Sequence, residues 1–170
     1  MKPDTVGRPD GKSAASPPFH MTGLWADGIL LTAAGERPVA ELRPGDRVIT
    51  RDAGMVTLRG ITLRSLRAPL VRIREGSLGH RRPGRDVLLP AGQPILVRDW
   101  RARALFGRDQ ALVAASRLVD GEFVTHAGCA TLDLCELDFD EPHILYLDGL
   151  EVASKRTSAL ATQGARRSLS

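Results

Sequence analysis

Apolar and polar residues alternate repeatedly along this chain, and this spacing limits the possible folds more than any other feature of the sequence. In RVITR (47–51), the valine and the threonine share one face and the other residues share the opposite face. In PLVRIRE (69–75), Val71 and Ile73 oppose two arginines. Because successive side chains of a strand point to opposite faces, this pattern predicts strands with one buried face each.

In two further segments the alternation changes parity. In TLDLCELDF (131–139) the apolar positions shift after Cys135, and we expect a β-bulge near Cys135 and Glu136 that keeps one face buried. In MVTLRGITL (55–63) the shift falls across Gly60, where we also expect a bulge, because glycine suits such positions.

Turn signals separate these segments at short intervals, as in Arg43-Pro44-Gly45-Asp46 and Asp120-Gly121. Asp148-Gly149 lies between HILYL and LEVAS, which predicts a tight β-hairpin. The one short helix that we expect spans about residues 110–116, where alanine and leucine favour it. These signals together predict an all-β domain of about ten short strands.

The two ends of the 170-residue chain differ from its middle. Residues 1–21 and 155–170 are rich in proline, glycine, serine and charge, and they contain no apolar run that could offset the entropy of ordering. We therefore predict a disordered N-terminal tail (1–21), one β domain (22–154) and a flexible C-terminal tail (155–170). Without a signal peptide or an apolar run of the ~20 residues that a membrane span needs, a cytoplasmic location is the default. Secretion by a non-classical route stays open.

An ordered series of segments carries a family resemblance. These segments are DGILLTAAGERPVAELRPGDRVITRDAG (27–54), VRIREGSLGHRRPGRDVLLPAGQPILVRDWRARALFG (71–107), RLVDGEFV (117–124) and FDEPHILYLDGLEVAS (139–154). Over about residues 23–154 the chain resembles bacterial Hint (Hedgehog/intein) domains. The resemblance implies the compact Hint-type β fold and, in active members, self-cleavage of the chain.

The resemblance also implies which residues carry that chemistry. Active members begin with a cysteine or a serine, which attacks the carbonyl of the preceding residue and converts the peptide bond into a thioester or an ester. Aligned on the GERPV segment, this first position falls on Gly23, which has no side chain. Thr22 has the nearest hydroxyl, one residue out of register.

Active members also use the histidine of a Thr/Ser-x-x-His block to protonate the leaving amide nitrogen. The matching stretch here runs from Pro90 to Gln93, and a glutamine side chain cannot supply that proton. Inteins further need a terminal asparagine, and this sequence contains none, although His126 to Cys129 faintly resembles an intein ending. The sequence thus indicates a degenerate member with no catalytic residue, no metal ligand and no cofactor site.

The remaining cysteines and histidines suggest no substitute site. Cys129 and Cys135 lie on one expected strand, and six residues span ~20 Å, too far for a disulfide, so we expect buried free thiols. His20 falls in the N-terminal tail, while His80 and His143 are expected to be surface or hydrogen-bonded residues.

Three functions remain open at this point. We favour a binding or scaffold module for a protein partner that the sequence does not identify. The first alternative is a self-cleaving protein that uses another nucleophile, such as Cys129 or Cys135. The second is an anion- or nucleic-acid-binding module, suggested by the net charge of +4 and by clustered arginines, although interleaved acidic residues weigh against it. The candidate arginines are Arg81, Arg82, Arg85, Arg101 and Arg103.

Overall fold

Strands dominate the structure, a computed structural model that describes residues 23–154. The two predicted tails, and Thr22, lie outside the described residues. The strands are β1 (Leu24–Trp25), β2 (Ile29–Thr32), β3 (Gly35–Pro38), β4 (Arg47–Thr50), β5 (Gly54–Thr57), β6 (Gly60–Ile73), β7 (Val87–Pro90), β8 (Pro94–Val97), β9 (Ala111–Ala114), β10 (Val124–Asp138), β11 (Ile144–Leu147) and β12 (Leu150–Ala153). Within residues 23–154 the helical segments are one α-helix, α2 (Trp100–Phe106), and two 3-10 turns, η2 (Val39–Glu41) and η3 (Ala115–Leu118). The all-β fold class predicted from the sequence is therefore confirmed.

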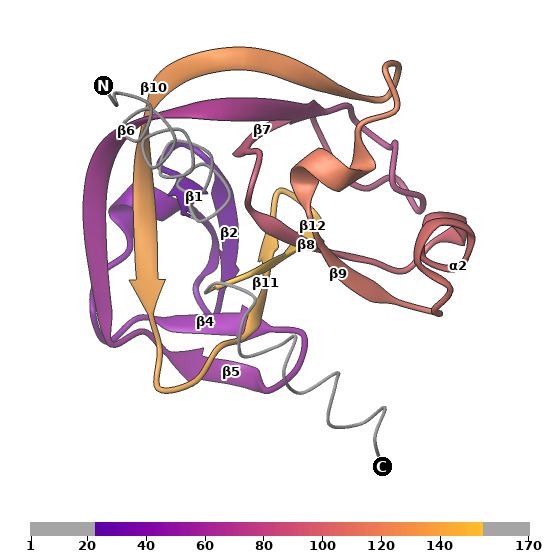
Figure 1. Cartoon of the computed structure of the whole chain (residues 1–170). Coiled ribbons are helices and arrows are strands. Elements are labelled where there is room, and N and C mark those ends of the chain that lie inside the picture. Colours follow the sequence, from indigo (N-terminus) through magenta and orange to yellow (C-terminus); the bar gives the residue numbers. More distant parts are fainter. Residues whose placement is uncertain (1–22, 155–170) are drawn as a thin grey trace, which may run out of the picture.

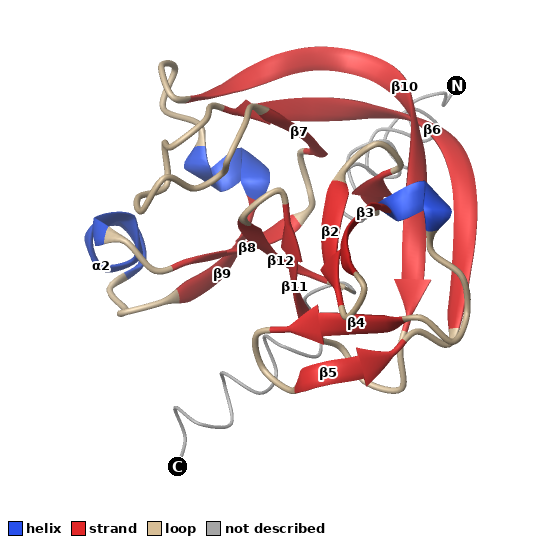
Figure 2. Ribbon diagram, turned by 180° about the vertical axis from the view of Figure 1, so that it is seen from behind, coloured by secondary structure: helices blue, strands red, loops and turns tan. Residues whose placement is uncertain are grey.

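The strands form two sheets (Figures 1 and 2). One sheet has the order β1-β10-β6-β7. The other has the order β3-β2-β4-β11-β12-β8-β9, with β5 paired to β4. The long strands β6 and β10 run side by side and bend together across the molecule (Figure 1). They are 14 and 15 residues long, so the expectation that every strand would be short is wrong for these two.

One hydrophobic core joins the two sheets. Leu30 of β2, Val71 of β6, Ile95 of β8 and Leu145 of β11 are fully buried members of a single apolar cluster. Burying apolar area in this way is the main favourable contribution to folding. The predicted alternation is confirmed in β4 and β6: Val48 is buried between exposed or half-buried neighbours, and Val71 and Ile73 are buried on either side of the exposed Arg72.

The hairpin prediction is also confirmed. Leu147 pairs with Leu150, and the two residues between them, Asp148 and Gly149, have φ angles of 50° and 87°. Positive φ at both central positions defines the type I′ turn, whose twist matches that of the two strands it joins.

The predicted helix over residues 110–116 is wrong, because this segment forms β9 and η3. β9 pairs along its whole length with β8, and these interstrand hydrogen bonds override the local preference of alanine and leucine for a helix. The helix lies earlier, at α2, where the Asp99 side chain caps the N-terminus and Gly107 ends the helix in a left-handed conformation.

Neither predicted bulge occurs where the sequence placed it. The pairing of β10 with β6 is continuous through Cys135 and Glu136, and its irregularity lies between His126 and Cys129. Leu134 and Cys135 are both buried because both faces of β10 are covered at this point. Near Gly60 the chain does not bulge but leaves β5, in one sheet, and enters β6, in the other.

No helix among residues 23–154 is long and apolar enough to cross a lipid bilayer.

Candidate functional site

Gly23 and Gln93, which are 70 residues apart in sequence, meet in a buried corner of the fold. The backbone N–H of Gly23 donates a hydrogen bond of 3.2 Å to Oε1 of Gln93. The family resemblance assigns these two positions to the nucleophile and to the histidine, and the structure brings them into contact. The Gln93 side chain therefore faces the backbone amide nitrogen of residue 23.

The Gln93 side chain is held in place by its own hydrogen bonds. It is 1% exposed and lies in the turn between β7 and β8. Its Nε2 group donates to the carbonyl of Pro94 at 3.2 Å and to the carbonyl of Ala153 at 2.9 Å. Because carbonyls accept both amide hydrogens, the side-chain oxygen must face Gly23, and Gln93 acts there as an acceptor.

The space that a side chain at position 23 would occupy lies against Leu134 of β10. A Cβ atom built on Gly23 would be 3.1 Å from the Leu134 Cβ, and the φ of Gly23 is +151°. Leu134 is itself 1% exposed and cannot move outward without exposing apolar surface. The fold at this corner therefore favours glycine.

Cys135 lies near this corner but on the other face of its strand. It pairs with Leu24 across β1 and β10, so its side chain shares the face of Leu24, whereas Gly23 and Trp25 belong to the opposite face. Burial, and to a lesser degree the charge of Asp133, raises the pKa of the Cys135 thiol. Cys135 is a buried free thiol as expected, but Cys129 is exposed, which corrects the expectation for that residue.

His143 forms a pair that the sequence analysis missed. Its Nδ1 lies 2.9 Å from Oδ2 of Asp52, and the ring is packed edge-on against Phe139. The hydroxyl of Ser154 accepts a hydrogen bond from the backbone N–H of His143, not from its ring. The expectation of a hydrogen-bonded histidine is confirmed, but Asp52 lies 91 residues away and no local spacing pointed to it.

Four of the five candidate arginines fall into two groups. Arg82 and Arg85 contact Glu151 and Asp148 of the β11–β12 hairpin, at 2.8 Å each, and the bond to Asp148 raises the pKa of Arg85. In α2, Arg101 and Arg103 pair with Asp99 and Asp109. Arg81 is exposed and makes no ion pair with the described residues. Four of the five are thus already paired with carboxylates.

A metal-binding arrangement is not found in residues 23–154, where no three histidine, cysteine, aspartate or glutamate side chains gather closely enough to hold an ion.

Comparison with known proteins gives one family and one fold. A sequence model of the Hint domain matches residues 22–158. The structure resembles a DnaB intein from Synechocystis sp. PCC 6803, with a TM-score of 0.55 and 10% identity over 78% of this chain and 97% of the other. It also resembles a bacterial intein-like domain from Clostridium thermocellum, with a TM-score of 0.54 and 17% identity over the same shares of the two chains. A search of the curated proteins finds no match. The match over most of the chain shows that this protein belongs to the Hint domain family.

Proposed function

We propose that this Hint-family domain does not cleave its own chain and instead serves as a binding or scaffold module. The hydrogen bond from the Gly23 N–H to Oε1 of Gln93 is the observation that carries this proposal. This bond joins the two positions that the family resemblance assigns to the nucleophile and to the histidine, and it supports the proposal because neither Gly23 nor Gln93 carries such a group.

An acyl shift at this corner needs a nucleophile and a proton donor. Glycine offers no atom that can attack the preceding carbonyl. Gln93 accepts a hydrogen bond from the amide nitrogen, whereas a leaving nitrogen must gain a proton, and both Nε2 hydrogens of Gln93 are directed to other carbonyls. Neither the nucleophilic attack nor the protonation of the leaving nitrogen therefore has a suitable group at this corner.

Cys135 is a poor replacement for the missing nucleophile. The thiolate is the reactive form of cysteine, and burial raises the pKa of the Cys135 thiol, so it stays protonated near neutral pH. Its side chain also lies on the other face of the sheet from position 23. His143 is held by Asp52 and cannot be assigned to this thiol.

The proposal is tested with a reporter domain fused ahead of the full chain. We expect mass spectrometry to find only the intact fusion after prolonged incubation, with or without a thiol or hydroxylamine, both of which release the upstream segment from a thioester or ester. A defined cut next to residues 22–24 would contradict the proposal. If Thr22→Ala abolished such a cut, the hydroxyl of Thr22 would be its nucleophile.

The triple variant Gly23→Cys/Gln93→His/Leu134→Ala serves as the comparison for this assay. It supplies a thiol and an imidazole and removes the side chain that a Cβ at position 23 would approach to 3.1 Å. Cleavage by this variant alone would show that the assay detects the reaction and that these positions withhold it in the natural sequence.

A further inference from the structure

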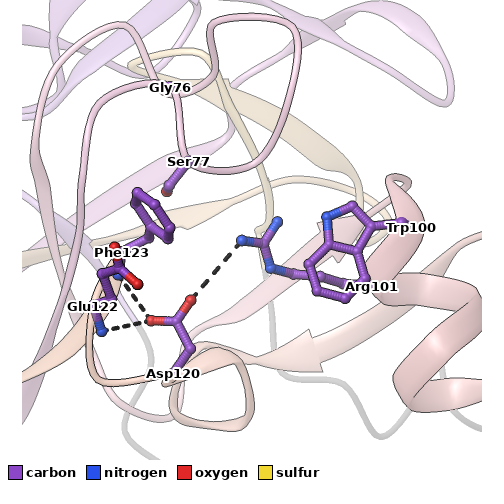
Figure 3. A pocket seen from close by; sticks show the side chains of 7 residues that line it. All are labelled: Gly76, Ser77, Trp100, Arg101, Asp120, Glu122 and Phe123. Atoms are coloured by element: carbon purple, nitrogen blue, oxygen red, sulfur yellow. Dashed lines mark hydrogen bonds and ion pairs between the residues drawn. The ribbon is translucent and has the colours of Figure 1, made fainter.

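A pocket of about 370 Å³ opens away from the Gly23–Gln93 corner, and none of the residues of that corner lines it. Its walls come from three segments: the loop at 76–77, the first turn of α2, and the loop at 120–123 that precedes β10 (Figure 3). The proposed loss of self-cleavage does not explain why this pocket is present.

Two exposed aromatic rings flank the pocket. Trp100 is 67% exposed and Phe123 is 42% exposed. In Figure 3 they stand on opposite sides, with Arg101 and Asp120 between them. Exposed aromatic side chains around a concave site are typical of binding surfaces, because they offer apolar area. An arginine of this chain already lies over each ring, Arg101 over Trp100 and Arg74 over Phe123.

One oxygen of the Asp120 carboxylate forms an ion pair with Arg101 but accepts no hydrogen bond from the residues that the structure describes (Figure 3). Its Oδ1 accepts hydrogen bonds from the backbone N–H groups of Glu122, Phe123 and Val124, at 2.9, 2.8 and 2.9 Å. Its Oδ2 is 4.0 Å from Nη2 of Arg101, which is beyond hydrogen-bond distance. Partial burial acts to raise the pKa of Asp120, but the three backbone bonds and the Arg101 charge together lower it, so this carboxylate is ionised at neutral pH.

The charges around the pocket favour a cation over an anion. The Arg101 side chain is 7% exposed, and Asp99 compensates its charge at 2.5 Å. Arg74, above the Phe123 ring, adds a second positive charge. Against these two stand the carboxylates of Asp99, Asp120 and Glu122, which leaves a net negative site.

The buried hydroxyl of Ser77 adds a polar group. Its oxygen has no hydrogen-bond partner within residues 23–154, although Ser77 lines the pocket. This oxygen has almost no accessible surface, so its missing hydrogen bond is a cost of the fold beside the pocket and not a ligand contact.

We propose that this pocket binds an arginine side chain of a partner polypeptide. The planar guanidinium would donate to Oδ2 of Asp120 and to the Glu122 carboxylate, and the aliphatic stem would pack against Trp100 and Phe123. This inference rests on the proposed role as a binding module, but it does not depend on whether the chain cleaves itself.

Acetyl-Gly-Arg-Gly-amide, titrated into the full-length protein, tests the proposal by NMR. The chain has two tryptophans, so its indole N–H groups give two side-chain signals, and Trp100→Phe identifies the one that belongs to Trp100. We expect the Trp100 signal to shift with the arginine peptide and not with the matched citrulline peptide, which has nearly the same shape and no charge. An equal response to both peptides, or no response to the arginine peptide, would overturn the proposal.

Two conservative variants locate the contact. Asp120→Asn keeps an oxygen for the three backbone N–H groups but loses the charge, and we expect it to weaken binding roughly tenfold. Glu122→Gln, at an exposed position, should weaken it about threefold, and it keeps the test valid should the first variant not fold. The control Glu141→Gln removes an exposed charge that does not line the pocket and should leave binding unchanged. Unaltered binding by both pocket variants would reject the assignment, and the fusion assay would still decide separately whether the chain cleaves itself.

Discussion

At the residue scale, Gln93 joins three parts of the chain through one amide group. Its hydrogen bonds reach Gly23 ahead of β1, Pro94 at the start of β8, and Ala153 at the end of β12. We expect Gln93→Leu to destabilise the protein by about 2–4 kcal/mol, because it leaves buried N–H and C=O groups without partners. Urea denaturation followed by circular dichroism measures this difference.

Gln110→Leu is the matched control for that experiment. Gln110 is exposed, so the same chemical change there removes no buried hydrogen bond and should alter the free energy of unfolding by less than about 0.5 kcal/mol. Similar effects of the two substitutions would mean that the hydrogen bonds of Gln93 contribute little to stability.

The two cysteines should differ sharply in reactivity. Cys129 is exposed, whereas Cys135 is 1% exposed and burial raises its pKa. A thiol reagent such as Ellman's reagent is therefore expected to modify one thiol in the native protein and the second only after unfolding. Cys129→Ser should leave the native protein unreactive; rapid reaction of this variant would show that the region around β1 and β10 opens.

At the element scale, Glu151 of β12 forms ion pairs with arginines of three separate segments. Its Oε1 lies 2.8 Å from Arg82, in the loop before β7, and 2.7 Å from Arg98, after β8. Arg51, after β4, lies 3.1 Å from Oε2 but outside hydrogen-bond alignment. The Glu151 side chain is 1% exposed and the three arginine side chains are 18–33% exposed, so solvent screens this cluster only in part.

Glu151→Gln should therefore destabilise the fold by about 3 kcal/mol, because it leaves three clustered guanidinium groups without their counter-charge. The free energy of unfolding in urea at low salt checks the prediction. Asp140→Asn breaks the fully exposed pair with Arg59 and is the control, for which we expect little change. If both variants unfolded at the same denaturant concentration, the Glu151 cluster would not stabilise the fold.

A strand, turn or helix could be predicted from the sequence where its conformation depends on a few neighbouring residues. The alternation in β4 and β6 and the Asp148-Gly149 turn depend on a few neighbouring residues, and these predictions are confirmed. The helix at α2 was missed because its signals, the Asp99 cap and the terminal Gly107, flank only seven residues. The expected helix over 110–116 was wrong because pairing with β8 decides the conformation of that segment.

In the candidate site, too, some residues could be identified from the sequence, whereas others come together only through folding. The alignment on the family's motifs singled out Gly23 and Gln93, and the structure brings these two residues into contact. The His143–Asp52 pair and the Glu151 cluster could not be predicted, because each joins residues brought together only by the packing of distant strands. The pocket beside Trp100 could not be predicted either, because folding brings its walls together from three segments, at 76–77, 100–101 and 120–123.

At the scale of the whole molecule, the sequence predicted the family and the fold class through the order of its motifs, but not the division into two sheets. That division depends on the chain leaving one sheet at β5 and entering the other at β6, where the sequence indicated one continuous strand. A change of hydrophobic parity marks such a position but does not distinguish a bulge from a passage between sheets.

The pairing of β10 with β1 and β6 also determines when this protein can fold. Leu24 pairs with Cys135, and Gly60 pairs with Asp138, so β1 and β6 find these partners only near the end of the domain. While the ribosome synthesises the chain, β1 and β6 have no neighbour on that side until β10 has emerged. Contacts so distant in sequence slow folding and leave strand edges open to other chains. The nascent protein therefore cannot complete this sheet until late in translation. Translation arrest before residue 124 would release an aggregation-prone fragment.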